Sequence, residues 1–249
     1  MRYAQSILEL FNQVHRDGYD KSDLQLLRDT YALAVRAFTG LIRPSGKLFI
    51  AHCVGTASVL HCAGAPPCIT CAGLLHSAYM HGGLAGWGAG APKAARSEVR
   101  TLLGAEVEGL VARYATFEWN RRTIPTICRA LQAYDTVGKG VVLMRLANEV
   151  DENLDGGVLY LANLERKRET DRPIVPLLVE MARQLGYGSL GRELAVVFEQ
   201  TLSARTPDSK PQGLQRLVSL QVPRSCRRSF GSHLAEHTLR ALRLIRDRI

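Results

Sequence analysis

The sequence lacks the features of an exported or membrane protein. No stretch of about 18 residues is uninterruptedly apolar, so we expect no membrane span. The start, MRYAQSILELFNQVHRDGYD, has neither the apolar segment nor the small-residue cleavage site of a signal peptide, and it resembles an amphipathic helix instead. With 46% hydrophobic and 22% charged residues, the chain of 249 residues has the composition of a globular protein with a packed core. We therefore predict a cytoplasmic protein.

Closely spaced cysteines are also scarce. The six cysteines are Cys53, Cys62, Cys68, Cys71, Cys128 and Cys226. Only Cys68 and Cys71, in CITC, form a metal-like or redox-like pair. A zinc site would need a second such pair, and a thioredoxin-like site would need a βαβ pattern around the first. Neither is present, so we expect free thiols in a reducing compartment and no cofactor.

Positive charge exceeds negative charge, with a net charge of +9, and part of the excess lies near the C-terminus. Residues 222–249 hold seven arginines against Glu236 and Asp247. Such a patch could attract nucleic acid or an anionic ligand. The only Phe, Tyr or Trp among these arginines is Phe230, so the segment does not support a surface on which bases could stack. We therefore expect no nucleic-acid partner. We interpret the segment as a solvated helix face.

Two histidines in this segment have the spacing of a zinc-binding pair. His233 and His237 stand four residues apart, so they would share one face of a helix. Glu236 does not follow the first histidine, as the general base of a His-Glu-x-x-His motif does, and no third ligand lies nearby. We predict that Ser232 is the N-cap of a terminal helix and that no metal binds there.

Apolar residues recur with helical spacing along nearly the whole chain. SILELFNQV, from residue 6, and SDLQLLRDTYALAVRAF, with Ser22 as its expected N-cap, both follow the i, i+3, i+4, i+7 pattern. Further helices are predicted near residues 48–63, 67–81, 93–101, 104–116, 123–134, 137–152, 173–185, 189–203 and 232–247. Alternation of period two never lasts more than a few residues. The predicted fold class is all-α.

Loops divide this helical pattern. HGGLAGWGAGAPK, at 81–93, carries five glycines and Pro92, and could be a lid over a polar pocket or slack between two helices. RTPDSKPQG, at 205–213, is the second predicted loop. Either this loop or the run RKRETDRP, at 166–173, is expected to separate the core from a C-terminal helical region. We therefore expect a helical core with N-terminal helices over residues 1–165 and a helical C-terminal extension over residues 166–249.

Several segments align in order with a known family. The segments are RPSGKLFIAH at 43–52, CAGLLHS at 71–77, SEVRTLLGAEVEGLV at 97–111 and VLMRLANEVDENL at 142–154. Together they make residues 36–165 resemble the HD superfamily, and more closely the hydrolase domain of the bacterial guanosine tetraphosphate hydrolase and synthetase family. The resemblance implies an HD-domain-like helical bundle with a metal ion, often manganese, at its centre.

The resemblance fails at the metal. Carried over onto this sequence, the four ligand positions become His52, His76, Ser77 and Asn148. The family has an aspartate at each of the last two positions, and a hard divalent cation needs those anionic oxygens. The family's acidic pair would fall near Met80 and His81 and is also missing. We expect no bound metal there, although Asp151 or Asp155 could in principle replace a lost carboxylate.

The remaining polar residues would meet in one cavity of such a bundle. We expect acid/base roles for His52, His76 and His81, because histidine exchanges protons near neutral pH. Expected ligand-binding residues are Arg43, Lys47, Ser77, Tyr79 and Asn148. The alternative interpretation is a set of hydrogen-bonded core histidines left from an ancestral site.

Three functions follow. The first is an enzyme that acts on a small polar or phosphorylated metabolite by metal-independent histidine chemistry. The second is a divergent metal-dependent phosphohydrolase with a nucleotide-like substrate. The third is a non-catalytic ligand-binding or regulatory protein. The sequence leaves the substrate and the oligomeric state open.

Overall fold

A computed structural model describes residues 3–81, 93–154, 156–161, 164–205 and 218–219. The chain divides into Met1–Val218 and Ser219–Ile249, and the following description concerns the first unit. Its elements are α1 (Ile7–Arg16), α2 (Lys21–Phe38), β1 (Leu41–Ile42), α3 (Phe49–Ala63), α4 (Pro67–Leu75), α5 (Ala78–His81), α6 (Lys93–Thr116), α7 (Ile124–Ala130), η1 (Leu131–Ala133), α8 (Thr136–Leu154), η2 (Gly157–Tyr160), α9 (Leu164–Asp171), α10 (Val175–Gln184) and α11 (Gly188–Ser203). A further two-residue strand, β2 (Val218–Ser219), ends the described residues.

This element list confirms the all-α prediction. The described residues contain no strand longer than two residues. None of the described helices is long and apolar enough to cross a membrane. The five cysteines outside residues 220–249 are free thiols, and Cys53 and Cys71 are buried among apolar side chains. Burial raises the pKa of both thiols, so they are unreactive core residues.

Local capping sets where the first two helices begin. Ser6 caps α1, and its hydroxyl oxygen accepts a hydrogen bond from the backbone N–H of Glu9. The side-chain carboxylate of Glu9 in turn accepts a hydrogen bond from the backbone N–H of Ser6. The predicted cap at Ser22 is wrong. Asp20 caps α2 instead, and Ser22 lies within the first turn and donates its hydroxyl to Asp20. The carboxylate of Asp20 accepts this bond and also the bond from the backbone N–H of Asp23, which favours Asp20 as the cap.

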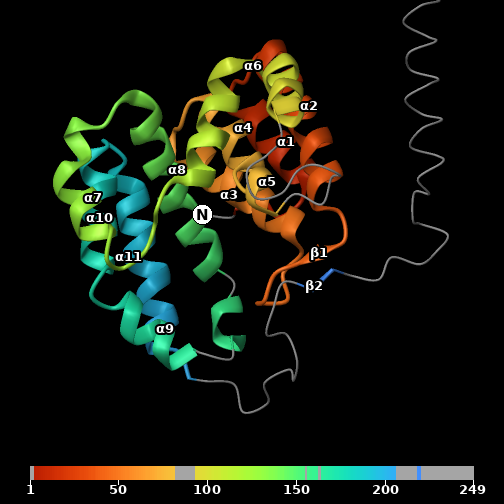
Figure 1. Cartoon of the computed structure of the whole chain (residues 1–249). Helices are drawn as coiled ribbons and strands as arrows, with labels where there is room; N and C mark the ends of the chain where they lie inside the picture. Colours follow the sequence, from red (N-terminus) through yellow and green to blue (C-terminus); the bar gives the residue numbers. More distant parts are fainter. Residues whose placement is uncertain (1–2, 82–92, 155, 162–163, 206–217, 220–249) are drawn as a thin grey trace, which may run out of the picture. The chain divides into compact units, whose positions relative to one another are not determined.

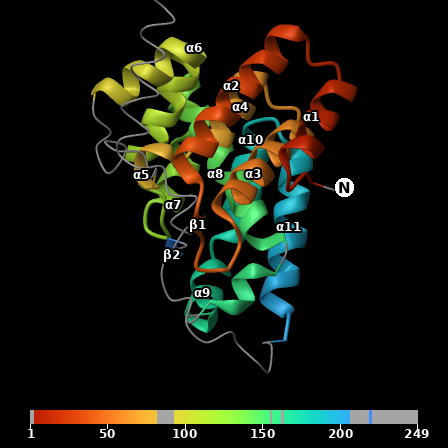
Figure 2. The ribbon, with the colours of Figure 1, turned by 90° about the vertical axis from the view of Figure 1, so that its right-hand side faces the viewer.

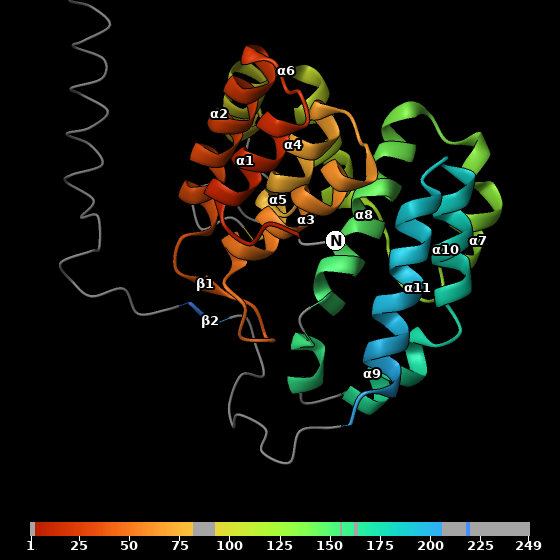
Figure 3. The same ribbon diagram turned by 180° about the vertical axis from the view of Figure 1, so that it is seen from behind.

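Helix α8 is the centre of the fold. Figures 1 and 3 show it between the helices α1 to α6 on one side and α7, α10 and α11 on the other. It packs on α3, α4 and α6 and on α10 and α11. Nine of its residues are buried apolar side chains or glycines on several faces, as expected for a helix surrounded by others. Side chains on several faces of α8 therefore contact other helices.

One predicted helix is interrupted, and two others are joined into one. The helix predicted over 67–81 breaks between α4 and α5, where His76 and Ser77 form a turn. The imidazole of His76 donates Nδ1–H to the carbonyl of Gly73 at 2.7 Å, which ends α4. The predicted gap between residues 101 and 104 is a kink in α6 at Gly104, whose φ of 88° favours glycine.

The run RKRETDRP, one of the two candidate separators between the core and the C-terminal region, is largely helical. Most of it belongs to α9, where Arg168 pairs with Glu165 and Lys167 with Asp171 at helical spacings of three and four residues. Helices α10 and α11 pack on α7 and α8, so the expected boundary at residue 165 lies inside the first unit. The glycine-rich segment, residues 206–213 of the second predicted loop and the predicted helix at 232–247, with His233 and His237, lie outside the described residues.

Candidate functional site

The imidazole of His52 joins α3 to α8. His52 is fully buried in the second turn of α3. Its Nδ1–H donates to Oδ2 of Asp151 at 2.6 Å, and its Nε2 faces Oδ1 of Asn148 at 3.1 Å. Asp151 and Asn148 stand three residues apart on α8, so both side chains reach the same ring. The contact replaces the metal-bound geometry that the HD resemblance implied.

A glycine makes this contact possible. Gly55 lies one turn after His52 on α3, and a Cβ added there would stand 1.8 Å from Oδ1 of Asp151. Only a residue without a side chain lets the carboxylate of Asp151 lie against the backbone of α3. The sequence of α3 is therefore adapted to the Asp151–His52 pair as well as to the core.

The amide of Asn148 has a defined orientation. Its Nδ2 donates to Oε1 of Glu152 at 3.3 Å, and this leaves Oδ1 toward His52. The opposite orientation would place the amide oxygen against the carboxylate of Glu152. Both ring nitrogens of His52 therefore face oxygen atoms.

Two cations complete the network. Nζ of Lys47 donates to both carboxylate oxygens of Asp151, at 2.8 and 3.0 Å. Arg43 forms an ion pair with Glu152 and lies over the ring of Phe49, with its Cζ 5.6 Å from the ring centroid. Burial by itself would raise the pKa values of the two carboxyls. Hydrogen bonding to His52 instead holds the pKa of Asp151 below its ordinary value, and Arg43 does the same for Glu152.

These side chains border a small cavity of about 110 Å³. Its charged and polar wall consists of Arg43, Ser45, Lys47, His52, Asp151 and Glu152. Its apolar wall consists of Pro44, Val158 and Leu161. A water molecule occupies about 30 Å³ in the liquid, so the cavity has room for a phosphate or carboxylate group. A whole nucleotide would need several times this volume.

His76 lies behind His52, away from the cavity walls. The two ring centroids are 5.2 Å apart, and the ring of Tyr114 lies 4.9 Å away on the other side. Nε2 of His76 is buried and accepts no hydrogen bond from the described residues. Burial, assisted by the neighbouring His52, lowers the pKa of His76 well below its ordinary value. His76 is therefore a neutral ring with an unused lone pair.

The other expected site residues lie farther from the cavity. Ser77 is buried in the turn after His76. Tyr79 is buried on the side of Glu108, and burial and this carboxylate raise its pKa. His81 is exposed at the end of α5, with its ring 5.8 Å from that of Phe49. Of the eight expected residues, only Arg43, Lys47 and His52 line the cavity, while Asn148 touches it through His52.

The four carried-over positions do not fit a metal ion. Within residues 3–81, 93–154 and the other described ranges, no group of three or more His, Cys, Asp or Glu side chains could hold one. Both nitrogens of His52 are engaged, and Lys47 neutralises Asp151, the carboxylate that lies closest. A metal ion at this place would need the negative charge of Asp151, and the ammonium group of Lys47 already neutralises that charge.

A second group of charges adjoins this network. Glu149, one turn before Glu152 on α8, accepts a hydrogen bond from the indole Nε1–H of Trp119 at 2.9 Å. Burial and repulsion from Glu152 raise the pKa of Glu149 to about 7. Lys167 and Asp171 of α9 act on the same carboxyl. Glu149 therefore carries its proton up to nearly neutral pH.

Comparisons with known proteins find a similarity to a domain family without an assigned activity. A family model described as a domain of unknown function (DUF6817) matches residues 35–119, which include His52 and His76 but not α8. No curated protein matches the sequence. Among solved structures, a metazoan ortholog of SpoT, described as hydrolysing ppGpp and playing a role in starvation responses, is similar over 74% of this chain and 97% of that chain, with 15% identity and a TM-score of 0.49. At this identity and TM-score the match carries no argument about activity.

Sequence reasoning missed the importance of Asp151 and Glu152. It considered Asp151 only as a replacement metal ligand. The available signal was spacing, since residues three and four after Asn148 share its face of the helix. Val158 and Leu161 had no sequence signal, because they reach the cavity only through the turn after α8.

Proposed function

We propose that this chain is a divergent HD-like protein that binds a small metabolite through a phosphate-sized anionic group and exchanges a proton with it without a metal ion. The observation that carries this proposal is the buried Asp151–His52 pair at the wall of a cavity that also presents Arg43 and Lys47. Asp151 holds the ring of His52 in one orientation, as the acid/base chemistry of histidine requires.

The charges around the cavity favour an anion. The wall carries two cations, Arg43 and Lys47, and the hydrogen-bonding ring of His52 beside the carboxylates of Asp151 and Glu152. Arg43 uses part of its guanidinium for Glu152 and has five N–H donors in all, so it can bind a phosphate oxygen as well. The volume of about 110 Å³ limits the bound group to the size of a phosphate, so the rest of the metabolite would extend outside.

The proton would pass through Nε2 of His52. A ligand oxygen that takes the place of the Asn148 amide oxygen receives the Nε2–H proton, and the ring keeps Nδ1–H bonded to Asp151. The negative charge of Asp151 stabilises the ring whenever it regains the proton. His76 could act as a second acceptor through its unused Nε2, whereas Tyr79 and His81 lie outside this scheme.

Calorimetric titration with inorganic phosphate and pyrophosphate tests the binding step. Lys47→Met and Arg43→Met should weaken binding at least about tenfold, since each removes a charged donor to the anion. Arg36→Met is the matched control. Arg36 forms a comparable ion pair with Glu98, at 2.7 Å, and neither residue lines the cavity. Equal affinity in all of these variants would place the anion elsewhere and overturn the proposal.

A screen of phosphorylated metabolites in the presence of EDTA tests the chemical step. Turnover should persist in the chelator and disappear in His52→Gln, with phosphate binding reduced but measurable. Turnover that requires added manganese would contradict the proposal and favour a metal-dependent hydrolase.

Binding without catalysis is the second candidate. The observation in its favour is that both nitrogens of His52 already have acceptors and both cations already have carboxylate partners. Such a network is stable without a substrate. Phosphate binding that depends on Lys47, combined with no turnover of any metabolite tested, would select this candidate.

A further inference from the structure

Part of the wall of the cavity beside His52 is apolar. Pro44 comes from the segment between β1 and α3, while Val158 lies in η2 and Leu161 follows it. Figures 1 and 2 show residues 43–48 and η2 side by side, and η2 packs on α8. Two segments that are far apart in the sequence thus provide one apolar surface next to the charged groups.

This apolar surface is separate from the main core. Val158 is buried, with 3% of its surface exposed. Neither Val158 nor Leu161 is among the described residues that form the main hydrophobic core or pack against it. Pro44 and Leu161 are half-buried, so the apolar surface extends from a buried residue to the outside of the molecule. A ligand group that leaves the cavity on this side would pass along apolar side chains.

The polar side chains of the cavity suit the phosphate group itself. Arg43 and Lys47 supply charged donors, and Ser45 supplies a hydroxyl group. The carboxylates of Asp151 and Glu152 could otherwise accept hydrogen bonds from sugar hydroxyls, but they already pair with Lys47 and Arg43. The described part of the wall thus offers donors to an anion and few acceptors to hydroxyl groups.

From this division of the wall we infer that the ligand is a phosphate monoester of an apolar carbon chain rather than of a sugar or nucleoside. Its phosphate binds at the charged part of the wall, and its first carbon groups lie against Val158 and Leu161. Each buried methylene group favours binding through the hydrophobic effect, whereas a buried hydroxyl group without a partner costs free energy. The inference rests on the proposed function for the phosphate and adds the class of the group attached to it.

The volume of the cavity limits how much of the chain is enclosed. A volume of about 110 Å³ is the space of roughly three to four water molecules in the liquid. A phosphate group takes up most of this space, so only the carbon groups nearest to it lie inside. Affinity should therefore rise from inorganic phosphate through methyl phosphate to ethyl phosphate, and level off once a longer chain reaches the solvent.

Calorimetric titration of the full chain with a series of phosphate esters tests this inference. Methyl and ethyl phosphate should each bind about three- to fourfold more tightly than the ligand one carbon shorter, as expected for one buried methylene group. Propyl phosphate and glycerol phosphate share a carbon skeleton and differ in hydroxyl groups. Propyl phosphate should bind at least about fivefold more tightly, because a hydroxyl group enclosed by the apolar wall lacks a partner. Equal affinities for these two esters would overturn the inference.

Val158→Thr tests the apolar wall directly, because threonine keeps the shape of valine and adds a hydroxyl group. It should reduce the preference for propyl phosphate over glycerol phosphate at least about threefold. Val196→Thr is the matched control, since Val196 is exposed on α11 and does not line the cavity. Equal preferences in Val158→Thr and Val196→Thr would overturn the inference. If Val158→Thr fails to fold, Leu161→Asn at a half-buried position gives the same test.

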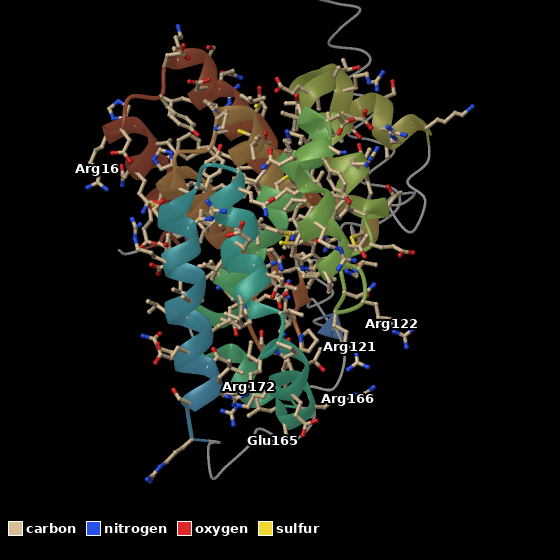
Figure 4. All side chains as sticks on the ribbon, turned by 90° about the vertical axis from the view of Figure 1, so that its left-hand side faces the viewer. Arg16, Arg121, Arg122, Glu165, Arg166 and Arg172 are labelled. Carbon is tan, nitrogen blue, oxygen red and sulfur yellow. The ribbon has the colours of Figure 1, made fainter. Side chains whose placement is uncertain are left out.

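The preference is a ratio of two affinities in one variant, so a general loss of binding does not change it. Arg166→Met controls for unspecific attraction of anions to surface charge, because Arg166 lies exposed on α9 (Figure 4). Both affinities should be unchanged in this variant. A loss of affinity in Arg166→Met as large as that in Lys47→Met would mean that the esters bind at surface charges, which contradicts the inference.

Failure of this inference is distinguishable from failure of the proposed function. Binding of inorganic phosphate that depends on Lys47, with no preference for propyl phosphate, would contradict the apolar ester and leave the proposed function standing. No binding of inorganic phosphate or of any ester would contradict both. A preference for propyl phosphate that Val158→Thr reduces and Val196→Thr retains would support the inference.

Discussion

Single residues around His52 decide the character of the site. Asp151 bonds one ring nitrogen, and Asn148, oriented by Glu152, faces the other. The ring of His52 is therefore held by two side chains of α8 that stand three residues apart. A buried network of this kind stabilises the fold only when every member has its partner, so substitutions in it should have large effects.

Gly55→Ala should break the network while adding a single methyl group. The new Cβ would stand 1.8 Å from Oδ1 of Asp151 and 2.7 Å from its Cγ, so the carboxylate must leave His52. We expect the free energy of unfolding to fall by about 1–3 kcal/mol in denaturant titrations. Gly109→Ala in α6, where a Cβ meets nothing within 4 Å, should instead be neutral or raise stability by about 0.5–1 kcal/mol. Equal effects of the two variants would show that Asp151 does not lie against Gly55.

Glu149→Gln should stabilise the protein in a pH-dependent manner. The pKa of Glu149 is raised from 4.5 to about 7 in the folded protein, so between these values the unfolded chain loses the proton first. Stability from this group therefore falls as pH rises through that window. Gln keeps an acceptor for Trp119 and has no proton to lose, so its advantage should grow to about 1–3 kcal/mol by pH 8. The check is urea unfolding at pH 5 and pH 8, and a constant difference between variant and wild type would contradict it.

At the scale of elements, α6 shows how charge holds a kink. Gly104 interrupts the helix with a φ of 88°. Arg96 and Arg100, before the kink, both donate to the fully buried carboxylate of Glu108, after it, at 2.5 and 2.9 Å. Burial opposes the ionised form, but Arg96 and Arg100 hold the pKa of Glu108 below its ordinary value. The two halves of α6 are thus joined by an ion-pair bracket across the glycine.

Glu108→Ala should loosen this bracket. Its arginine partners are about half exposed and can be solvated after the change, so we expect a loss of about 1–3 kcal/mol rather than the larger cost of stranding a buried charge. The free energy of unfolding measures the loss, and hydrogen exchange should show that residues 93–103 open first. Glu118→Ala, at an exposed position, is the control and should change stability by less than about 0.5 kcal/mol. A loss of similar size at Glu118 would remove the special role of Glu108.

At the scale of the whole first unit, α8 packs against α3, α4 and α6 on one side and against α10 and α11 on the other. It also carries the polar residues Asn148, Glu149, Asp151 and Glu152. The site and the core therefore share one element. A ligand or ion bound at this place would stabilise the entire unit, because binding to the folded state alone adds to the free energy of unfolding.

Chelation should leave the melting temperature of the protein unchanged. A bound metal whose free concentration is 100 times its dissociation constant would add about 2.7 kcal/mol to the free energy of unfolding. Its removal would lower the melting temperature by several degrees. The side chains of His52, Asn148 and Asp151 are already satisfied by one another. Differential scanning calorimetry with EDTA, and again with added manganese, makes the measurement. A clear shift in either direction would mean that a metal site exists in this chain.

Local pattern determined much of the architecture. Helical spacing of apolar residues predicted the all-α class and the positions of α1, α3, α8, α10 and α11 within a few residues, because this signal depends only on neighbours along one helix. It failed at Ser22, where a carboxylate two residues earlier makes the better cap, and at α9, whose helix lacks an apolar stripe. In both places side-chain contacts override the pattern.

The sequence brought His52, His76 and Asn148 forward as candidates through ordered motifs that resemble those of the HD superfamily. Tertiary structure alone decided what these residues contact. The Asp151 and Asn148 partners of His52 lie 99 and 96 residues away, and the Lys47–Asp151 pair spans 104. Contacts between residues so far apart in the sequence depend on how α3 packs against α8, including the space that Gly55 leaves. The spacing of residues along one helix carries no information about this packing.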